Sequence, residues 1–222
     1  MTIFSRNIGS ITVEQQRQLK RKSVSVIGCG GLGGHVIDQL VRLGVGTVHC
    51  FDPDNFSLSN CNRQLYATAA TLGQNKAQAA AERAAAISSC SKVIPFPVDY
   101  RQAAMKVVRQ IDAVVDCIDD IPARLELAEL CRQHERMLVH GAVSGWVGQV
   151  GIQAAAGSLY KRLYPAGAAD KNEPLSVLAC TVAMVAALQV SETLKILLQL
   201  PVDLEEKTLF IDLRQQEFIR CS

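Results

Sequence analysis

The chain has 222 residues and a formal net charge of +2, with 49% hydrophobic and 20% charged residues. This composition is that of an ordinary globular protein, and it excludes a disordered or low-complexity chain. The small net charge indicates no nucleic-acid partner. The length allows one large domain or two small ones.

Eight cysteines and four histidines are spread along the chain without any C-x-x-C pair. Zinc ribbons and fingers need closely spaced ligand pairs, so we expect no zinc site. The N-terminus lacks the apolar stretch of a secretory signal. The longest apolar run, residues 175–190, is shorter than the ~20 residues that span a bilayer. We therefore expect a cytoplasmic protein with free thiols and no membrane partner.

Helices and strands alternate from residue 12 onward. Thr12 and Gln15 have the spacing of a capping box, and Gly44 can end the second helix. This alternation predicts a doubly wound, Rossmann-like α/β fold with a mostly parallel sheet. The predicted helices are 12–20, 34–43, 72–87, 101–110 and 122–134, and the predicted strands are 23–27, 47–51, 92–98, 112–117 and 137–143.

The pattern changes after Ser144. Residues 146–155 favour a further strand, 156–173 a loop and 175–199 a long apolar helix. Residues 208–213 and 217–221 favour a terminal hairpin, which gives the sheet a C-terminal antiparallel extension. No linker or internal repeat interrupts the chain, so we expect one domain.

A glycine-rich loop, GCGGLG at 28–33, lies between the first predicted β-strand and the helix after it. It matches G-x-G-x-x-G, in which the glycines let the backbone approach a phosphate and the helix N-terminus offers unpaired N–H groups. Asp52 ends the next strand about 20 residues later, where a carboxylate can accept hydrogen bonds from ribose hydroxyls. We therefore predict nucleotide binding by Gly28, Gly30, Gly31, Leu32, Gly33 and Asp52.

Two cations, Arg63 and Lys76, follow the ribose-type carboxylate. A triphosphate carries more negative charge than a dinucleotide bridge and favours additional cations, so this pair favours ATP over NAD. Both residues also fit ordinary surface positions, on a loop and on the solvated face of an alanine-rich helix. By themselves they leave the choice of nucleotide open.

Five motifs occur in a fixed order along the chain: G-x-G-G-L-G at 28–33, D-x-D at 52–54, S-N-x-x-R-Q at 59–64, L-G-x-x-K-A at 72–77 and V-D-C-x-D at 115–119. Together they resemble the ThiF/MoeB/HesA adenylating proteins of the ubiquitin-activating, E1-like superfamily. The resemblance extends from about residue 6 to residue 198. It implies ATP as the nucleotide and Mg²⁺ as its metal.

The resemblance implies a nucleotide-binding role for the residues that follow the second strand. Asp52 matches the ribose-binding aspartate, and Asp54 is the second carboxylate of D-x-D. Lys76 matches a phosphate-binding lysine. Ser59, Asn60 and Arg63 match the segment that lies over the phosphates.

Three further residues follow from the resemblance. Asp119 matches the aspartate that holds Mg²⁺, and Asp120 stands where the family usually has asparagine. Arg6, in F-S-R-N, resembles an N-terminal arginine that reaches the ATP of the partner subunit in a homodimer. The residues implied to be catalytic are Arg6, Arg63, Lys76 and Asp119.

The implied reaction is the attack of a protein's C-terminal carboxylate on the α-phosphate of ATP, which yields an acyl adenylate and pyrophosphate. The implied substrate is a ubiquitin-like sulfur-carrier protein ending in Gly-Gly, in thiamine, molybdopterin or related sulfur-transfer biosynthesis. The carboxylate is already ionised, so the enzyme has to position the reactants and neutralise charge. Residues 1–222 are then one adenylation domain, with a nucleotide-binding core at about 20–145 and a carrier-facing, dimer-forming region at about 146–222.

The sequence departs from the family in its cysteines. Leu159-Tyr-Lys-Arg162 stands where many relatives have the first C-x-x-C pair of a zinc site, and the chain stops at Cys221-Ser222, near the expected second pair. Some relatives carry a cysteine that bonds the carrier, in a loop matching 157–176, and this chain has none there. The nearest, Cys180, is expected in the core. We therefore expect adenylation without an enzyme thioester.

Three other functions remain open at this point. The chain could activate another carboxylate with ATP, as tRNA-modifying dehydratases or peptide-modifying relatives do. It could be a non-catalytic nucleotide-binding partner. An NAD-dependent oxidoreductase would need a hydride-transfer acid or base, and none stands out. The lone tryptophan, Trp146, precedes Gly148-Gln149 and fits either core packing or contact with a carrier tail.

Overall fold

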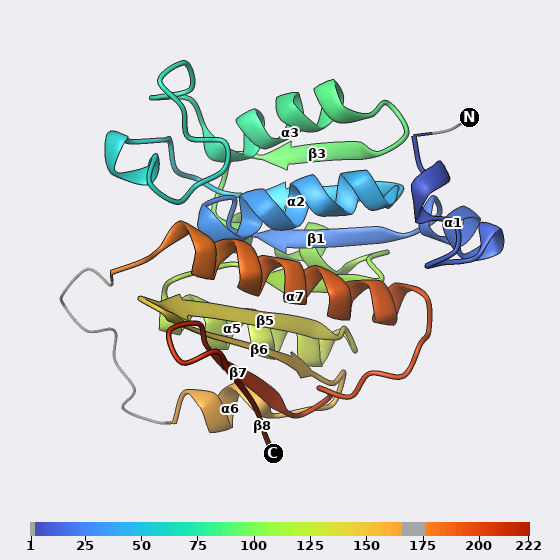
Figure 1. Cartoon of the computed structure of the whole chain (residues 1–222), viewed down its shortest axis with the longest axis vertical. Helices are drawn as coiled ribbons and strands as arrows, with labels where there is room; N and C mark the ends of the chain where they lie inside the picture. The colour runs from blue at the N-terminus through green and yellow to red at the C-terminus, as the bar shows by residue number, and fades with distance from the viewer. Residues whose placement is uncertain (1–2, 166–175) are drawn as a thin grey trace.

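The computed structural model describes residues 3–165 and 176–222. These residues contain one eight-stranded sheet (Figure 1). Its strand order is β3-β2-β1-β4-β5-β6-β7-β8. The strands are β1 (Ser23–Ile27), β2 (Thr47–Phe51), β3 (Lys92–Phe96), β4 (Ala113–Asp116), β5 (Leu138–Ser144), β6 (Val147–Gln153), β7 (Thr208–Asp212) and β8 (Glu217–Cys221).

The sheet has a parallel half and an antiparallel half. Strands β1 to β5 pair in parallel, and β5 to β8 pair antiparallel. From β1 the chain builds outward to β2 and β3 and then crosses back to β4 on the other side of β1. This reversal is the topological switch point where open α/β sheets bind ligands. The predicted Rossmann-like fold with its antiparallel extension is therefore confirmed.

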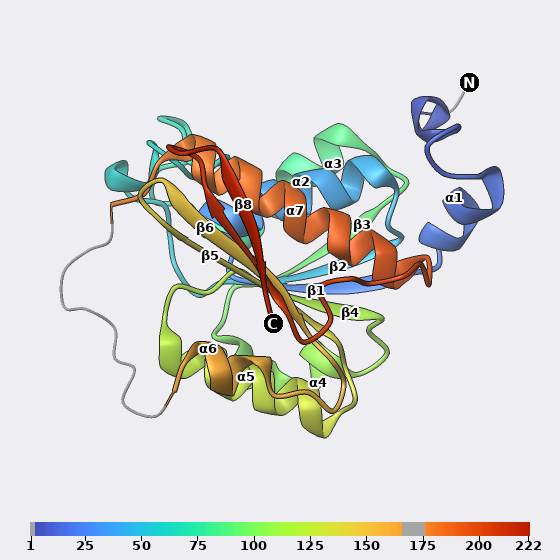
Figure 2. The ribbon, with the colours of Figure 1, turned by 60° about the horizontal axis from the view of Figure 1, so that its bottom comes forward.

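Helices cover both faces of the sheet (Figure 2). Helices α2, α3 and α7 lie on one face, and α4, α5 and α6 lie on the other. The helices are α1 (Val13–Leu19), α2 (Gly31–Leu43), α3 (Lys76–Ile87), α4 (Ala104–Val108), α5 (Ile121–Gln133), α6 (Leu159–Leu163) and α7 (Ala179–Leu197), with short 3-10 helices η1 (Ser5–Asn7), η2 (Leu58–Asn60) and η3 (Tyr100–Ala103).

Helix α2 begins inside the glycine loop rather than at residue 34. Gly30 is its N-cap residue and has no capping side chain, while Gly44 ends it with φ +83°. Gly28 has φ +92° and lies against the Cys117 carbonyl, where a methyl group would collide. A methyl group on Gly33 would collide with the Gly28 carbonyl. The glycines therefore let strand and helix approach closely, which leaves the helix N-terminus open.

Other elements differ from the sequence prediction in extent. Helix α3 starts at Lys76 instead of residue 72, because the Asn75 side chain accepts hydrogen bonds from the first helical N–H groups. Residues 101–110 divide between η3 and the short α4. The predicted loop at 156–173 contains α6 before its remainder passes outside the described residues.

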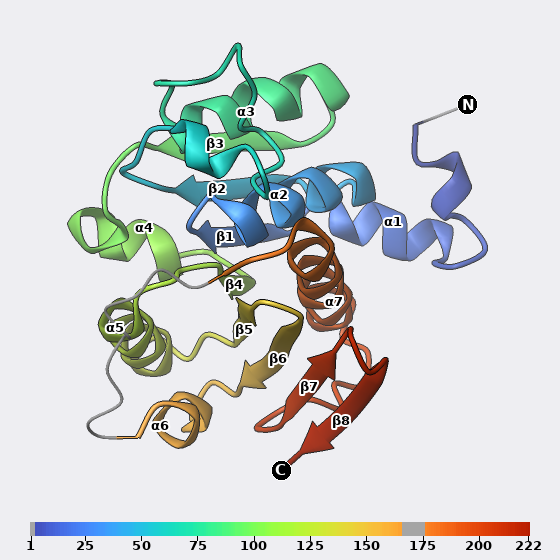
Figure 3. The same ribbon diagram turned by 60° about the vertical axis from the view of Figure 1, so that its left-hand side comes forward.

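The capping box of Thr12 and Gln15 is confirmed. The strand β3, which contains Pro95, lies at the edge of the sheet. The terminal hairpin is also present, with β8 as the outer strand of the sheet (Figure 3). All five residues of β8 are exposed. β8 therefore adds length to the sheet but little to its core.

Helix α7 is long and apolar enough to cross a membrane by length and composition alone. Half of it is buried within the protein, and it packs against α2, β5 and β6. These contacts are those of a core helix. Cys180 was expected to be buried there, and this expectation is wrong: Thr181 and Val182 face the protein interior, which leaves Cys180 exposed.

Candidate nucleotide-binding cleft

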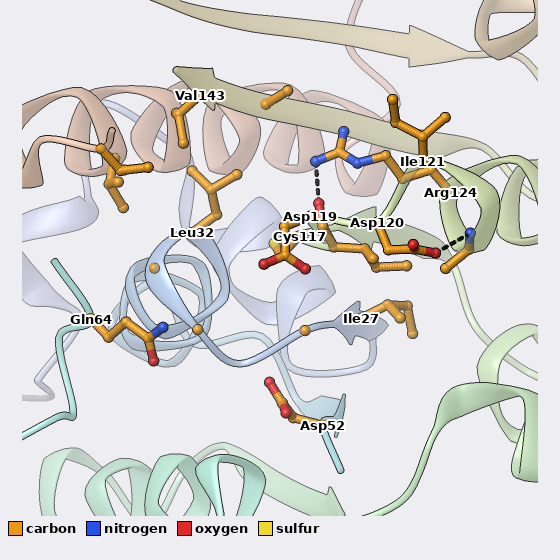
Figure 4. Close-up of a pocket in the computed structure, with 18 of the residues that line it drawn as sticks. Ile27, Leu32, Asp52, Gln64, Cys117, Asp119, Asp120, Ile121, Arg124 and Val143 are labelled. Atoms are coloured by element: carbon orange, nitrogen blue, oxygen red, sulfur yellow. Dashed lines mark hydrogen bonds between the residues drawn. The ribbon is translucent and has the colours of Figure 1, made fainter. Parts of the chain in front are cut away.

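A cleft of about 970 Å³ opens at the carboxyl ends of β1, β2 and β4, at the switch point of the sheet (Figure 4). Pockets of this size hold cofactor-sized ligands. Most of the predicted site residues converge on it from five separate segments of the chain. Those that line it are Gly28, Gly30, Gly31, Leu32, Asp52, Asp54, Arg63, Lys76, Asp119 and Asp120.

Four predicted residues do not line the cleft. Gly33 lies behind the loop, where it permits close packing on Gly28. Ser59 and Asn60 belong to η2, and the Ser59 carbonyl accepts a hydrogen bond from Arg63 Nη1 at 3.0 Å. The Asn60 carbonyl accepts from the Arg63 N–H at 3.1 Å, so both residues help to position Arg63.

Arg6 lies at the opposite end of the molecule from its own cleft. It is an exposed residue of η1. The N-terminal segment is fixed to the far end of α2, where Gln16 Nε2 donates to the Leu43 carbonyl at 2.8 Å. The 13 residues of α2 separate the two ends by about 20 Å. Arg6 could therefore act only on the cleft of another subunit.

Asp52 connects the end of β2 to the glycine loop. Its Oδ2 accepts from the Cys29 N–H at 2.7 Å and its Oδ1 from the Asp54 N–H at 2.9 Å. Burial raises the pKa of this carboxyl above its usual value, although nearby Lys76 and the two N–H groups act in the opposite direction. These two bonds fix the carboxylate at the mouth of the loop, where a ribose hydroxyl can donate to it.

Lys76 is paired with Asp54. Its Nζ lies 2.9 Å from Asp54 Oδ2, and the lysine side chain is only 10% exposed against 67% for the aspartate. Arg63 Nη1 donates to the Ser59 carbonyl and to Asn62 Oδ1 at 2.9 Å. The side chains of Lys76 and Arg63 are therefore both held in place by neighbouring groups at the cleft.

Asp119 and Asp120 directly precede α5 but differ in what their carboxylates do. Asp120 Oδ1 accepts from the Ala123 N–H at 2.7 Å and so caps the helix (Figure 4). Capping gives this aspartate a structural role beside its place in the cleft. Asp119 is exposed and lines the same cleft.

Mg²⁺ bound with a nucleotide usually takes one or two carboxylates, phosphate oxygens and water. The Asp119 carboxylate fits that partial role. Among residues 3–165 and 176–222, no group of three or more His, Cys, Asp and Glu side chains could hold a metal by itself. Leu159–Arg162, which stand where relatives have a cysteine pair, form most of α6.

A buried charge cluster supports the floor of the cleft. Asp116 is fully buried between Arg124, whose Nη1 lies 3.4 Å away, and His140, whose Nδ1 lies 3.3 Å away. Tyr160 donates to Asp116 Oδ2 at 2.7 Å. Burial raises the pKa of Asp116, but Arg124 and His140 outweigh it and hold that pKa below the usual value. Burial lowers the pKa of His140, which favours the neutral imidazole.

The far side of the cleft is made by the antiparallel half of the sheet. The strands β5 and β6 contribute mostly small or apolar residues together with Gln149, and β7 contributes Phe210. Ala142, Ser144 and Gly148 leave space on this wall for an extended chain of small residues. Trp146 precedes β6 and is 47% exposed, so the packing interpretation is not supported. The wall lining residues are Ala142, Val143, Ser144, Val147, Gly148 and Gln149.

The sequence prediction missed several residues that line this cleft. Gln64 is the last residue of S-N-x-x-R-Q and lines the cleft, but the motif predicted no role for it. Arg124 and Tyr164 gave no signal, because a buried arginine in α5 and a tyrosine after α6 look like surface residues in a sequence. Their Nη1 and hydroxyl atoms lie 3.0 Å apart at the edge of the cleft.

Two cysteines lie close to the nucleotide motifs. Burial raises the pKa of the Cys29 and Cys117 thiols well above the usual value. Both therefore stay protonated and act as small apolar side chains.

The strand order of the sheet, the glycine loop and the two cations Arg63 and Lys76 are typical of a nucleotide-binding protein of the Rossmann-like α/β class. A sequence model described as the ThiF family matches residues 4–222. The chain therefore belongs to the ThiF family, as the motifs suggested.

Named relatives include adenylyltransferases. The chain is 33% identical over 190 residues to "Adenylyltransferase and sulfurtransferase MOCS3-1" of Zea mays, covering 83% of this chain and 41% of that protein. It is 32% identical over 216 residues to "Sulfur carrier protein adenylyltransferase" of Thermus thermophilus, covering 92% of this chain and 80% of that protein. The chain thus spans about two fifths of the maize relative's length. The relatives' names agree with the predicted enzyme class.

Solved structures share the fold at low sequence identity. The structure described as "Crystal structure of E. coli MccB + MccA-N7isoASN" superposes with a TM-score of 0.85 at 18% identity, covering 99% of this chain and 70% of that chain. PaaA superposes with a TM-score of 0.79 at 21% identity, covering 93% and 65%. These likenesses confirm the Rossmann-like architecture with its antiparallel extension.

Proposed function

We propose that this chain is an ATP-dependent adenylyltransferase that activates the C-terminal carboxylate of a ubiquitin-like sulfur-carrier protein ending in Gly-Gly. The reaction forms an acyl adenylate and releases pyrophosphate. It belongs to thiamine, molybdopterin or related sulfur-transfer biosynthesis. Membership of the ThiF family and the names of the relatives support the class of reaction.

One observation carries the proposal: the predicted nucleotide-binding residues and the wall formed by β5 and β6 line the same cleft. The glycine loop, Asp52 and the two cations lie in segments that follow the parallel strands β1 and β2, and Ala142 and Gly148 lie on the antiparallel pair β5 and β6 opposite. The small residues Ala142 and Gly148 leave room in this wall for a Gly-Gly tail in extended form. Its terminal carboxylate then meets the phosphates between the two halves.

The reaction requires positioning more than acid–base chemistry. A carboxylate oxygen forms a bond to the α-phosphorus, the bond from that phosphorus to the bridging oxygen breaks, and pyrophosphate leaves with the electron pair. Negative charge moves onto the leaving group. Arg63 and Lys76 lie where they can neutralise that charge, and preorganised donors of this kind contribute about 3 kcal/mol each to the transition state.

Mg²⁺ would bind ATP phosphate oxygens with the Asp119 carboxylate as its protein ligand. When bound it supplies positive charge to the phosphates. The chain's own part is to present one exposed carboxylate at the start of α5 while Asp120 holds the helix end in place.

A homodimer and a cytoplasmic location are further parts of the proposal. The dimer is supported by the place of Arg6, about 20 Å along α2 from its own cleft. Sedimentation of the full chain tests it, since a fully active monomer would remove any role of Arg6 in a partner's cleft.

The central experiment is ATP–pyrophosphate exchange with purified candidate carriers. We expect exchange that depends on the carrier and is lost when its Gly-Gly is deleted. Asp119→Ala and Arg63→Ala should reduce it about 100-fold or more, whereas Arg109→Ala, an exposed control outside the cleft, should not. Exchange near the wild-type rate in both cleft variants would overturn the assignment. Exchange with a tRNA or free peptide instead of a carrier would favour the other carboxylate substrates.

A further inference from the structure

Tyr164 places a hydroxyl group beside the wall formed by β5 and β6. The residue directly follows α6 and lines the cleft. Its hydroxyl oxygen accepts a hydrogen bond from Arg124 Nη1 at 3.0 Å. Burial raises the pKa of the Tyr164 hydroxyl, so the group stays protonated. A guanidinium accepts no hydrogen bond, so the hydroxyl hydrogen needs an acceptor other than Arg124.

His140 does not supply that acceptor. Its Nε2 lies 3.4 Å from the Tyr164 hydroxyl, but Gln149 Nε2 lies closer to the same nitrogen, at 3.1 Å. A neutral imidazole has a hydrogen on one ring nitrogen and a single lone pair on the other. If Nε2 has the lone pair, the nearer amide of Gln149 takes it, and if Nε2 has the hydrogen, it accepts nothing. The Tyr164 hydroxyl therefore keeps a hydrogen for which neither Arg124 nor His140 is a free acceptor.

The hydroxyl lies against the part of the wall that contains Ala142. Gln149 is the direct cross-strand partner of Ala142, and His140 lies two residues before Ala142 on β5. These three side chains therefore share one face of the sheet. Helix α6, which leads into Tyr164, packs against β6 and α5 on the face away from α7 (Figure 2). The glycine loop and the two cations, by contrast, follow β1 and β2.

The chemistry of this group indicates what it binds. A hydroxyl that accepts from a guanidinium is polarised and becomes a better donor, while it stays uncharged. An uncharged single donor suits a carbonyl oxygen, whereas the nucleotide phosphates are matched by Arg63 and Lys76. A Gly-Gly tail has no side chains, so its main-chain carbonyls are the acceptors that it offers to the wall.

We propose that the Tyr164 hydroxyl donates a hydrogen bond to a main-chain carbonyl of the carrier's C-terminal tail. This inference rests on the proposed function, because it takes that tail as the ligand of the wall. Tyr164 then recognises the extended main chain and takes no part in the transfer of the adenylyl group. Arg124 is a positioning residue, because it holds the hydroxyl oxygen in place.

The test is ATP–pyrophosphate exchange with the full chain and a carrier that supports it. Tyr164→Phe keeps the ring and removes the hydroxyl. We expect the KM for the carrier to rise about fivefold, as for one lost hydrogen bond between neutral groups, with kcat and the KM for ATP unchanged. Tyr66→Phe, a buried position outside the cleft, is the matched control and should change neither KM. An unchanged KM for the carrier in Tyr164→Phe, or a rise in the KM for ATP instead, would overturn the inference.

A second measurement separates contact from packing. Carriers are prepared with an ester in place of the last or the next-to-last peptide bond, because an ester carbonyl is a weaker acceptor than an amide carbonyl. Wild-type protein should bind one of these esters more weakly than the amide carrier, and Tyr164→Phe should reduce that difference. An equal difference in both proteins would overturn the role of Tyr164 alone. Absence of carrier-dependent exchange in the wild type would overturn the proposed function, and the role of Tyr164 with it.

Discussion

The ammonium group of Lys76 lies 2.9 Å from the carboxylate of Asp54, within the cleft where a phosphate would bind. The Asp54 carboxylate thus forms an ion pair with Lys76, the cation that the proposed reaction needs for the phosphates. The lysine is held nearly buried by this contact, while the aspartate stays accessible to solvent. Incoming phosphates must share Lys76 with Asp54 or displace it.

Asp54→Asn should therefore strengthen ATP binding measured without Mg²⁺. A half-exposed pair of this kind is worth up to about 1 kcal/mol, so the gain should be at most about fivefold. Calorimetric titration measures it. Asp203→Asn, an exposed change before β7, is the control. A tenfold loss of affinity in Asp54→Asn would show instead that the carboxylate assists nucleotide binding.

The buried cluster predicts a large effect on stability. Asp116→Asn leaves the guanidinium of Arg124 in the interior without its carboxylate partner. Removing one partner of a buried pair costs about 3–5 kcal/mol, which lowers the thermal midpoint by about 10 °C for a chain of this size. Calorimetry measures the shift. The double variant Asp116→Asn, Arg124→Met should recover part of the loss, and no recovery would mean that the pair is not coupled.

Stability should fall as the pH drops below neutral. The pKa of His140 in the folded protein lies below its usual 6.5, because burial disfavours the imidazolium. The unfolded chain then binds more protons below pH 6.5, so the stabilisation is complete above that pH and declines as the pH falls. Asp116, with its depressed pKa, adds a second loss below about pH 3.8.

Chemical denaturation at pH 7.0 and pH 5.5 tests this. The wild type should lose unfolding free energy between the two, and His140→Gln should lose less. Burial also lowers the pKa of His35 and His49, so His35→Gln serves as the comparison. An equal loss in wild type and His140→Gln would refute the prediction for this residue.

Glu206 fastens α6 to the segment before β7. Its carboxylate accepts from the Ala154 and Ser158 N–H groups at 2.9 and 3.0 Å, and Arg162 Nη1 lies 3.1 Å away. We expect Glu206→Ala to cost about 2 kcal/mol, because two N–H groups lose their acceptor. Arg162→Ala removes only a partly exposed ion pair and should cost under about 1 kcal/mol. Equal losses in the two variants, measured by urea denaturation, would contradict this ranking.

Much of the fold could be predicted because its signals are local. The β-branched run before GCGGLG, the capping pair Thr12 and Gln15, and Gly44 each determine a boundary through nearby backbone geometry. The start of α3 was placed four residues too early, because leucine and glycine at 72 and 73 fit a helical pattern. The Asn75 side chain decides the start instead.

The site was predictable only where a motif marks it. Asp52, Arg63 and Lys76 follow recognisable spacings and reach one cleft. Arg124 and His140 meet Asp116 through three separate elements, and pairing between distant segments leaves no local pattern. Asp120 shows the converse: its match to the family position that usually holds asparagine predicted a nucleotide-binding role, and in the structure it lines the cleft while its carboxylate also caps α5.

The outer strand β8 is held to the sheet by β7 alone, and each of its five residues faces solvent. Detaching it would expose little apolar surface, so its amide hydrogens should exchange with solvent through local opening. The amides of β1 and β4, buried at the centre of the sheet, can exchange only when the whole domain unfolds. Protection therefore rises from the C-terminal edge toward the switch point, and the most protected strands are the ones that carry the nucleotide cleft.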